Sequence, residues 1–261
     1  SSLVTGVQTC ALPISIAQPT EVERRQHLDE MLSALNMHYE LVKTSPPVPR
    51  DQWHQVGFNH EKSRTLLGRD LSCGEIGCFL SHRAAWKLAA ESDRPSLILE
   101  GDADLNESSR DVCEMLSDGR ASWELAMLYY SKCIPSVWYQ QRLDNTFRLA
   151  KFANRRAYCL AAYMLTPAGA RKLLKLSESF YLPADDFVSG GWIRKDLDMF
   201  AIVPKAAGLC PVQSGNSNLE DDRQRNKTRK HKKKDNNRLL RRLELYLREL
   251  GQRYRPPRKS L

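Results

Sequence analysis

The sequence predicts an α/β fold, and three observations support this prediction. Short apolar runs, typical of buried strands, alternate along the chain with segments whose apolar residues recur at helical spacing. The chain has 261 residues, of which 41% are hydrophobic and 27% are charged, as in an ordinary globular protein. No apolar run approaches the roughly 20 residues that span a bilayer, so the sequence predicts no transmembrane helix.

The first predicted elements are a helix and a short strand. Thr20 and Glu23 form a capping-box pattern, and apolar residues follow at helical spacing, which predicts a helix over residues 20–35. Residues 39–42 are expected to form a strand. Three prolines then open a loop that is expected to extend to about residue 68.

A longer helix is predicted over residues 73–90, where Ser72 and Glu75 form a second capping-box pattern. Glu75 and His82 are seven residues apart, so they lie on one stripe of this helix, two turns apart. From that stripe both side chains can reach one ligand. The alternative for His82 is a packed histidine whose second ring nitrogen has a backbone partner.

An acidic motif follows the next predicted strand, which covers residues 96–99. Asp102 and Asp104 come directly after this apolar run. In open α/β sheets ligands bind beyond the carboxyl ends of the strands, and carboxylates one residue apart can hold a hard divalent ion. Such an ion can bridge the oxygens of a diphosphate. The alternative is an acidic surface turn.

A second acidic pair lies further along the chain. Strands are predicted over residues 123–130, 157–165 and 199–203, with a helix that starts at Pro167. Between the last two strands, Asp185 and Asp186 begin another short helix. In glycosyl transfer to a hydroxyl, one carboxylate must take the acceptor proton. The alternative is that these aspartates only favour the start of the helix through its dipole.

The positive charge is concentrated in one segment. The chain carries 40 Lys+Arg and 31 Asp+Glu, a net charge of +9, but residues 223–261 hold 16 of the basic and 3 of the acidic residues. The tail therefore carries +13 and the other 222 residues −4. Residues 235–250 predict a basic amphipathic helix, which either lies on an anionic membrane or docks on the body of the protein.

Cysteine usage indicates a reducing compartment. The seven cysteines are widely spaced and include no CxxC pair, which argues against a disulfide framework or a zinc site. The six histidines form no HxxxH or HExxH pair. The sequence also contains no GxGxxG motif and no P-loop.

The first 17 residues are expected to be a leader outside the folded domain. They lack the basic and long apolar regions of a signal peptide. Residues 1–15 resemble translated sequencing-adaptor read-through. On this interpretation, the native first strand of the domain is missing.

Several blocks of the sequence, in the same order, resemble glycosyltransferase family 25, the lipooligosaccharide-biosynthesis family related to the collagen galactosyltransferases. The longest runs from Leu71 to His82, with Trp86 four residues on, and resembles the family's GEIGCxLSHxxxW block. The shorter blocks are LILEGDA from Leu97, WEL from Trp123, AY from Ala157, PAGARKLL from Pro167 and PAD from Pro183. The resemblance extends from about residue 20 to residue 219.

This resemblance implies a GT-A-like, Rossmann-type nucleotide-sugar-binding domain, expected over residues 18–222. It implies inverting transfer of galactose or glucose from a UDP-sugar to a lipooligosaccharide or lipopolysaccharide core, with Mn²⁺ or Mg²⁺ bound. Asp102 is then expected to hold the metal and Asp185, beside Asp186, to act as the base. Gly74, Glu75, His82 and Glu100 are expected at the donor site.

The chain departs from the family pattern in two places, because it lacks the family's opening I-N-L strand and has a glycine in an acidic motif. Gly101 stands where the family has a second acid, so Asp104 is expected to compensate as a metal ligand.

The enzyme is expected at the cytoplasmic face of the membrane, held by its basic tail near a glycolipid acceptor, with no nucleic acid bound. Two alternatives stay open: a nucleic-acid-binding protein that acts through the tail, and an inactive relative that binds a sugar nucleotide.

Overall fold

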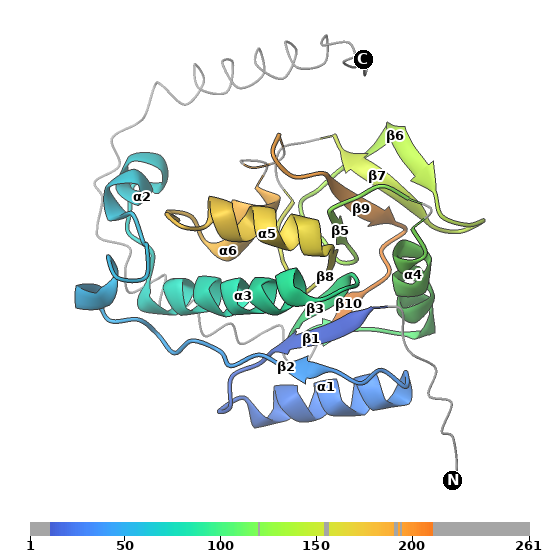
Figure 1. Cartoon of the computed structure of the whole chain (residues 1–261), viewed down its shortest axis with the longest axis horizontal. Coiled ribbons are helices and arrows are strands. Elements are labelled where there is room, and N and C mark those ends of the chain that lie inside the picture. Colours follow the sequence, from blue (N-terminus) through green and yellow to red (C-terminus); the bar gives the residue numbers. More distant parts are fainter. Residues whose placement is uncertain (1–10, 120, 154–156, 191–192, 194, 211–261) are drawn as a thin grey trace. The chain divides into compact units, whose positions relative to one another are not determined.

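The computed structural model describes residues 11–119, 121–153, 157–190, 193 and 195–210 (Figure 1). The predicted tail, residues 223–261, with its helix over 235–250, lies outside the described residues, as do residues 1–10. Among the described residues, no helix is long and apolar enough to cross a bilayer.

The centre of the fold is an eight-stranded mixed sheet, accompanied by a two-stranded ribbon. The strands are β1 (Leu12–Ile16), β2 (Glu40–Leu41), β3 (Ser96–Glu100), β4 (Ala103–Asp104), β5 (Leu125–Met127), β6 (Pro135–Arg142), β7 (Arg148–Phe152), β8 (Ala162–Leu165), β9 (Met199–Val203) and β10 (Gly208–Leu209). The large sheet has the order β2-β1-β3-β8-β5-β9-β7-β6, and β4 pairs with β10. Strands β8 and β7 run antiparallel to their neighbours.

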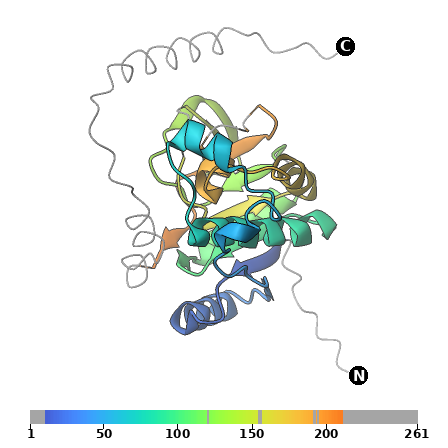
Figure 2. The same ribbon diagram turned by 90° about the vertical axis from the view of Figure 1, so that its left-hand side faces the viewer.

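Helices cover both faces of this sheet. They are α1 (Val22–Ala34), α2 (His60–Leu67), α3 (Cys73–Glu91), α4 (Glu107–Ser117), α5 (Pro167–Leu176) and α6 (Ala184–Ser189), with a 3₁₀ turn, η1 (Arg50–Gln52). Buried residues of α3, α5 and α6 pack in one core, and those of α1 and α4 pack in a second core. Both Figure 1 and Figure 2 show β1 between α3 and α1. The architecture is therefore a three-layer α/β/α domain, which confirms the predicted fold class.

The expectation of a missing first strand is wrong. Residues 12–16 form β1, which pairs in parallel with both β2 and β3. Ile14 is fully buried in the core, and the neighbouring Leu12 and Ile16 pack against it. This apolar alternation suits a strand inside the sheet. The folded domain therefore includes residues that were expected to belong to the leader.

The predicted loop between residues 46 and 68 contains η1 and α2. Helix α2 has a polar sequence, so its apolar periodicity is weak, but its ends follow ordinary capping rules. Asn59 Oδ1 accepts a hydrogen bond from Lys62 N, and Gly68 ends the helix at φ 73°. Helix α4 and the β6–β7 hairpin were also not predicted. Strand β6 lies at the edge of the sheet, and its side chains are mostly exposed.

Candidate functional site

The candidate site lies where β3 ends. Glu100 is the last residue of β3 and pairs with Ile16, the last residue of β1. Its backbone N–H donates to Ala161 O, at the start of the antiparallel strand β8. Loops that follow β1 and β3 therefore meet the loop that precedes β8 at one edge of the sheet. This edge is where open α/β sheets bind their ligands.

Asp102 is a partly buried carboxylate at this edge. Its Oδ1 atom is buried and has no hydrogen-bond partner among the residues that the structure describes. Burial raises the pKa of Asp102, the negative charge of Glu100 raises it further, and Arg24 opposes both effects. A carboxylate without a buried partner, beside a second carboxylate, has unused capacity to bind a cation.

One aspartate from each predicted acidic pair, Asp102 and Asp185, acts through its charge on the same thiol, Cys159. Burial raises the pKa of Cys159 to about 12, and the charges of Glu100, Asp102 and Asp185 raise it as well. Asp185 is in the first turn of α6, far from β3 in the sequence. The charges of three carboxylates from distant parts of the sequence thus act on the same thiol. Cys159 has φ 76°, a conformation that non-glycine residues seldom adopt.

The residues present fit a hard divalent cation. Carboxylate oxygens are the ligands that Mn²⁺ and Mg²⁺ prefer. A cation between Glu100 and Asp102 would offset their repulsion and give the buried Oδ1 atom a partner. The structure therefore groups Asp102 with Glu100 for such a role.

Asp104 and Asp186 have different surroundings from their neighbours. Asp104 is exposed on β4, where it pairs with Gly208, and its side chain lies over that glycine. The charges that shift the pKa of Asp102 are those of Glu100, Arg24 and Glu21, rather than that of Asp104. Asp186 donates its backbone N–H to Asp185 Oδ1 in the first turn of α6. Asp102 and Asp185, rather than Asp104 and Asp186, are the aspartates whose charges raise the pKa of Cys159.

Glu75, predicted at the donor site, is bound within the fold by its neighbours. Its side chain is 1% exposed, and both carboxylate oxygens accept hydrogen bonds from Arg69, at 2.6 and 2.7 Å. One of these oxygens also accepts from Ser72 N, which completes the predicted capping box. Gly74 lies in the same first turn. Burial and these bonds leave Glu75 unable to touch a ligand.

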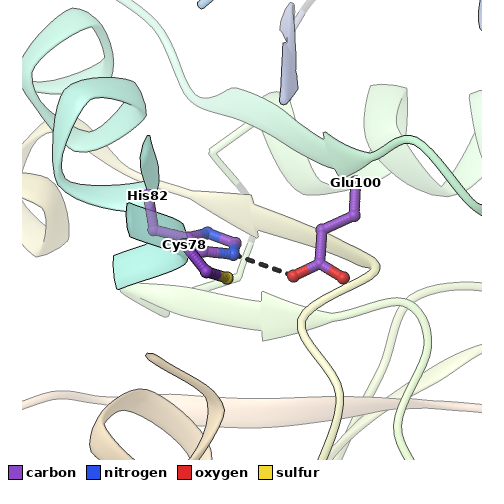
Figure 3. A group of neighbouring side chains, drawn as sticks. All are labelled: Cys78, His82 and Glu100. Carbon is purple, nitrogen blue, oxygen red and sulfur yellow. Dashed lines mark hydrogen bonds and ion pairs between the residues drawn. The ribbon is translucent and has the colours of Figure 1, made fainter. Parts of the chain in front are cut away.

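His82 is also fully buried, so it cannot contact a donor directly. Its Nε2 atom lies 2.9 Å from Glu100 Oε1, and its Nδ1 atom lies 3.0 Å from the Tyr163 hydroxyl. Figure 3 shows His82 and Cys78 on α3, facing Glu100. Ligand atoms of these three residues lie within 4.8 Å of one another. The predicted pairing of Glu75 with His82 on one ligand-binding stripe is therefore replaced by a pairing of His82 with Glu100.

Arg24 and Cys159 are site residues that sequence reasoning missed. Arg24 lies in the first turns of α1 and is paired with Glu21 at 2.8 Å. A Cβ atom at Gly101 would lie 3.1 Å from Arg24 Cβ and Cδ, so the glycine lets this arginine approach closely. Arg24 belongs to no motif that could be recognised in the sequence. Cys159 could have been singled out only by its residue type.

Comparisons with known proteins agree with this class of site. The chain matches the family model "Glycosyltransferase family 25 (LPS biosynthesis protein)" over residues 14–188. The match covers most of the chain and includes the last three residues of β1, all of α3, and Glu100, Asp102 and Asp185. The protein thus has the fold of a glycosyltransferase and belongs to glycosyltransferase family 25, as its sequence motifs predicted.

Relatives of the chain include both bacterial and animal proteins. It is 26% identical to a putative glycosyltransferase from Haemophilus influenzae, over 80% of this chain and 76% of that protein. It is 30% identical to a glycosyltransferase 25 family member from Anopheles gambiae, over 72% of this chain and 33% of that protein. It is 31% identical to a probable inactive glycosyltransferase 25 family member 3 from Rattus norvegicus, over 51% of this chain and 24% of that protein. The chain thus spans a third or less of these two animal relatives.

Proposed function

We propose that the protein is an inverting glycosyltransferase that moves galactose or glucose from a UDP-sugar to a lipooligosaccharide or lipopolysaccharide core or a similar envelope glycan. Membership of glycosyltransferase family 25 supports the class of reaction. One observation carries the assignment of the site, namely the convergence of Glu100, Asp102 and Asp185 around Cys159. The shared effect of these charges on one thiol supports a cation-binding pair and a candidate base in the same site.

Glu100 and Asp102 are the residues that would hold Mn²⁺ or Mg²⁺. When bound, the ion would neutralise negative charge that develops on the leaving diphosphate. Arg24 adds a positive charge to this site, since its charge lowers the pKa of Asp102. Gly101, which has no Cβ atom, leaves room for this arginine.

Asp185 is the proposed base. The acceptor hydroxyl oxygen attacks the anomeric carbon, the bond from that carbon to the diphosphate oxygen breaks, and the hydroxyl proton passes to Asp185. UDP leaves with the electron pair of the broken bond. Asp185 is half-buried, and its backbone is fixed by a hydrogen bond from Ser189 Oγ to Asp185 O at 2.6 Å.

The basic tail is the proposed membrane contact. Its +13 charge would attract anionic lipid at the cytoplasmic face and bring the enzyme to a glycolipid acceptor. Sedimentation with anionic vesicles tests this proposal. We expect the full chain to sediment and the chain without residues 223–261 to stay in the supernatant. Equal sedimentation of both would contradict a role for the tail.

UDP release tests the catalytic proposal. The chain is incubated with UDP-galactose or UDP-glucose, Mn²⁺ and a lipooligosaccharide core acceptor. We expect Asp102→Asn to reduce turnover by roughly 100-fold or more. Asp104→Asn is the matched control and should retain most activity, because the structure groups Asp102 with Glu100 instead. Full turnover by Asp102→Asn would reject the metal assignment.

A separate variant tests the base. We expect Asp185→Asn to lower turnover by roughly 100- to 10,000-fold while donor binding is retained. Asp186→Asn is its control, because the pKa of Cys159 responds to Asp185. Turnover equal to that of the unchanged protein in Asp185→Asn would reject this role.

A second candidate function is donor binding without turnover. Two observations favour it: Gly101 replaces an acid of the family pattern, and some relatives are named inactive. Binding of UDP-galactose with no UDP release under any of these conditions would establish it. Binding of oligonucleotides that weakens with salt and disappears without residues 223–261 would instead support a nucleic-acid-binding function.

A further inference from the structure

A chain of three buried side chains ends on Glu100. Trp86, Tyr163 and His82 are all 0% exposed. The Trp86 indole nitrogen lies 2.9 Å from the Tyr163 hydroxyl, which lies 3.0 Å from His82 Nδ1. His82 Nε2 then lies 2.9 Å from Glu100 Oε1. The chain thus connects the interior of α3 and β8 to the last residue of β3.

The Trp86 indole at the start of this chain favours one arrangement of its protons. An indole N–H only donates, so Tyr163 must accept a hydrogen bond from Trp86. The phenol has one proton of its own, which it then donates to His82 Nδ1. Burial raises the pKa of Tyr163 well above its usual value, so this proton stays in place. A neutral imidazole that accepts at Nδ1 carries its proton on Nε2 and donates it to Glu100.

From these contacts we infer that His82 is a positioning residue, fixed by Tyr163 and Trp86, that holds the Glu100 carboxylate for the donor site. The donor-site role of the fixed carboxylate rests on the proposed function. Glu100 Oε1 is the atom that His82 holds, and Oε2 has no hydrogen-bond partner within the described part of the chain. The Glu100 side chain is 29% exposed, which leaves it accessible to a ligand.

The same geometry argues against a soft-metal site at Cys78, His82 and Glu100, although their ligand atoms are close. A metal would need the lone pair of His82 Nε2, which requires the ring proton to move to Nδ1. The Tyr163 hydroxyl would then face two donors, and its own proton would lose its acceptor inside the core. The hydrogen bonds are all satisfied only when Nε2 carries the proton.

Nitrogen NMR of the histidine ring tests the inference without any activity. In protein labelled with ¹⁵N-histidine, the His82 signals are identified by their absence from the His82→Gln spectrum. We expect the unchanged protein to show neutral His82 with its proton on Nε2, and Tyr163→Phe to shift the ring toward a mixture of tautomers. A proton on Nδ1 in the unchanged protein, or loss of the Nε2 proton of His82 on addition of Zn²⁺, would overturn the inference.

Binding of Mn²⁺, followed by electron paramagnetic resonance, tests the purpose of the positioning. We expect Tyr163→Phe and His82→Leu to weaken Mn²⁺ binding roughly 10–100-fold, as loss of a group that orients a metal ligand typically does. His82→Gln should recover part of the affinity, because its amide can donate to Glu100. A folded His82→Leu variant that binds Mn²⁺ as tightly as the unchanged protein would overturn the positioning role.

Tyr130→Phe is the matched control. Tyr130 is 6% exposed and donates to Ile202 O at 3.1 Å, so its variant loses a buried phenol hydrogen bond elsewhere in the sheet. We expect this variant to keep its Mn²⁺ affinity, and circular dichroism establishes that each variant is folded. If the unchanged protein bound no Mn²⁺, the proposed metal role would fail, and the tautomer of His82 would still decide the positioning inference.

Discussion

The first half of α3 and the end of β3 use their polar residues in opposite ways. In α3, the motif residues form complete local networks: Glu75 is bonded to Arg69 and Ser72, and Ser81 bridges Ser45 N and Gly77 O. At the end of β3, Asp102 keeps a buried oxygen atom without a partner beside the charge of Glu100. Groups that are already satisfied stabilise a fold, whereas unsatisfied charge is available to bind a ligand.

The motif that is easiest to recognise is therefore not the one that holds the proposed chemistry. The GEIGC block is the longest motif of the sequence, yet most of its polar residues hold α3 in place. The short LILEGDA block holds Glu100 and Asp102, the carboxylates that we propose bind a cation. His82 connects the two regions, because it lies in the first block and bonds to Glu100 in the second. Substitutions in α3 should therefore change stability first, and those at β3 should change function first.

The largest effect on stability is expected at Glu75. Glu75→Ala removes a buried ion pair and the acceptor of the capping box, so we expect a loss of about 3 kcal/mol in the free energy of unfolding. Urea unfolding measures it. Glu107→Ala, an acidic residue in the first turn of α4, is the control with little expected change. A stable Glu75→Ala variant that bound UDP-sugar poorly would break the comparison.

A smaller loss is expected at Gly77. A Cβ atom there would lie 2.8 Å from the carbonyl oxygen of Pro46, so α3 or the loop must move to accept it. We expect Gly77→Ala to lower the free energy of unfolding by about 1–3 kcal/mol, as overpacking does. Urea unfolding of both proteins checks this value. An unchanged midpoint would show that the loop adapts freely.

Asp102→Asn is expected to raise stability at neutral pH. Folding raises the pKa of Asp102, so the folded protein holds this proton more tightly than the unfolded chain, and the ionised carboxylate costs stability at pH 7. Below the ordinary aspartate pKa of about 3.9 the group is protonated in both states, and this cost disappears. The gain in melting temperature should therefore shrink as pH falls toward that value. A lower melting temperature for Asp102→Asn at pH 7 would contradict an unsatisfied carboxylate.

The smallest effect is expected at Gly101. A Cβ atom there would meet two atoms of Arg24 at 3.1 Å, and Arg24 is only half-buried, so it can move a few tenths of an ångström. We expect Gly101→Ala to change the free energy of unfolding by less than about 1 kcal/mol. Thermal unfolding measures it, with Gly77→Ala as the more crowded counterpart. A loss as large as that of Gly77→Ala would show that Arg24 is rigidly held.

Local patterns predicted the elements with strong signals. The Ser72 capping box, the start of α5 at Pro167 and strands β3 and β9 all occur as expected. The predicted strand over residues 157–165 is confined to β8, because Cys159 adopts a positive φ just before it. Helix α2 and strand β6 are polar or exposed, so they lack the apolar periodicity on which such predictions depend.

The α/β class, the family and the acidic residues at the ends of elements could all be read from the sequence. The fold was needed to show that β1 belongs to the sheet, that Glu75 pairs with Arg69, and that His82 contacts Glu100. Capping and periodicity depend on neighbours within a few residues, so they can be read from the chain. The convergence of β3 and α6 on Cys159 joins segments more than 80 residues apart, and only folding brings those charges together.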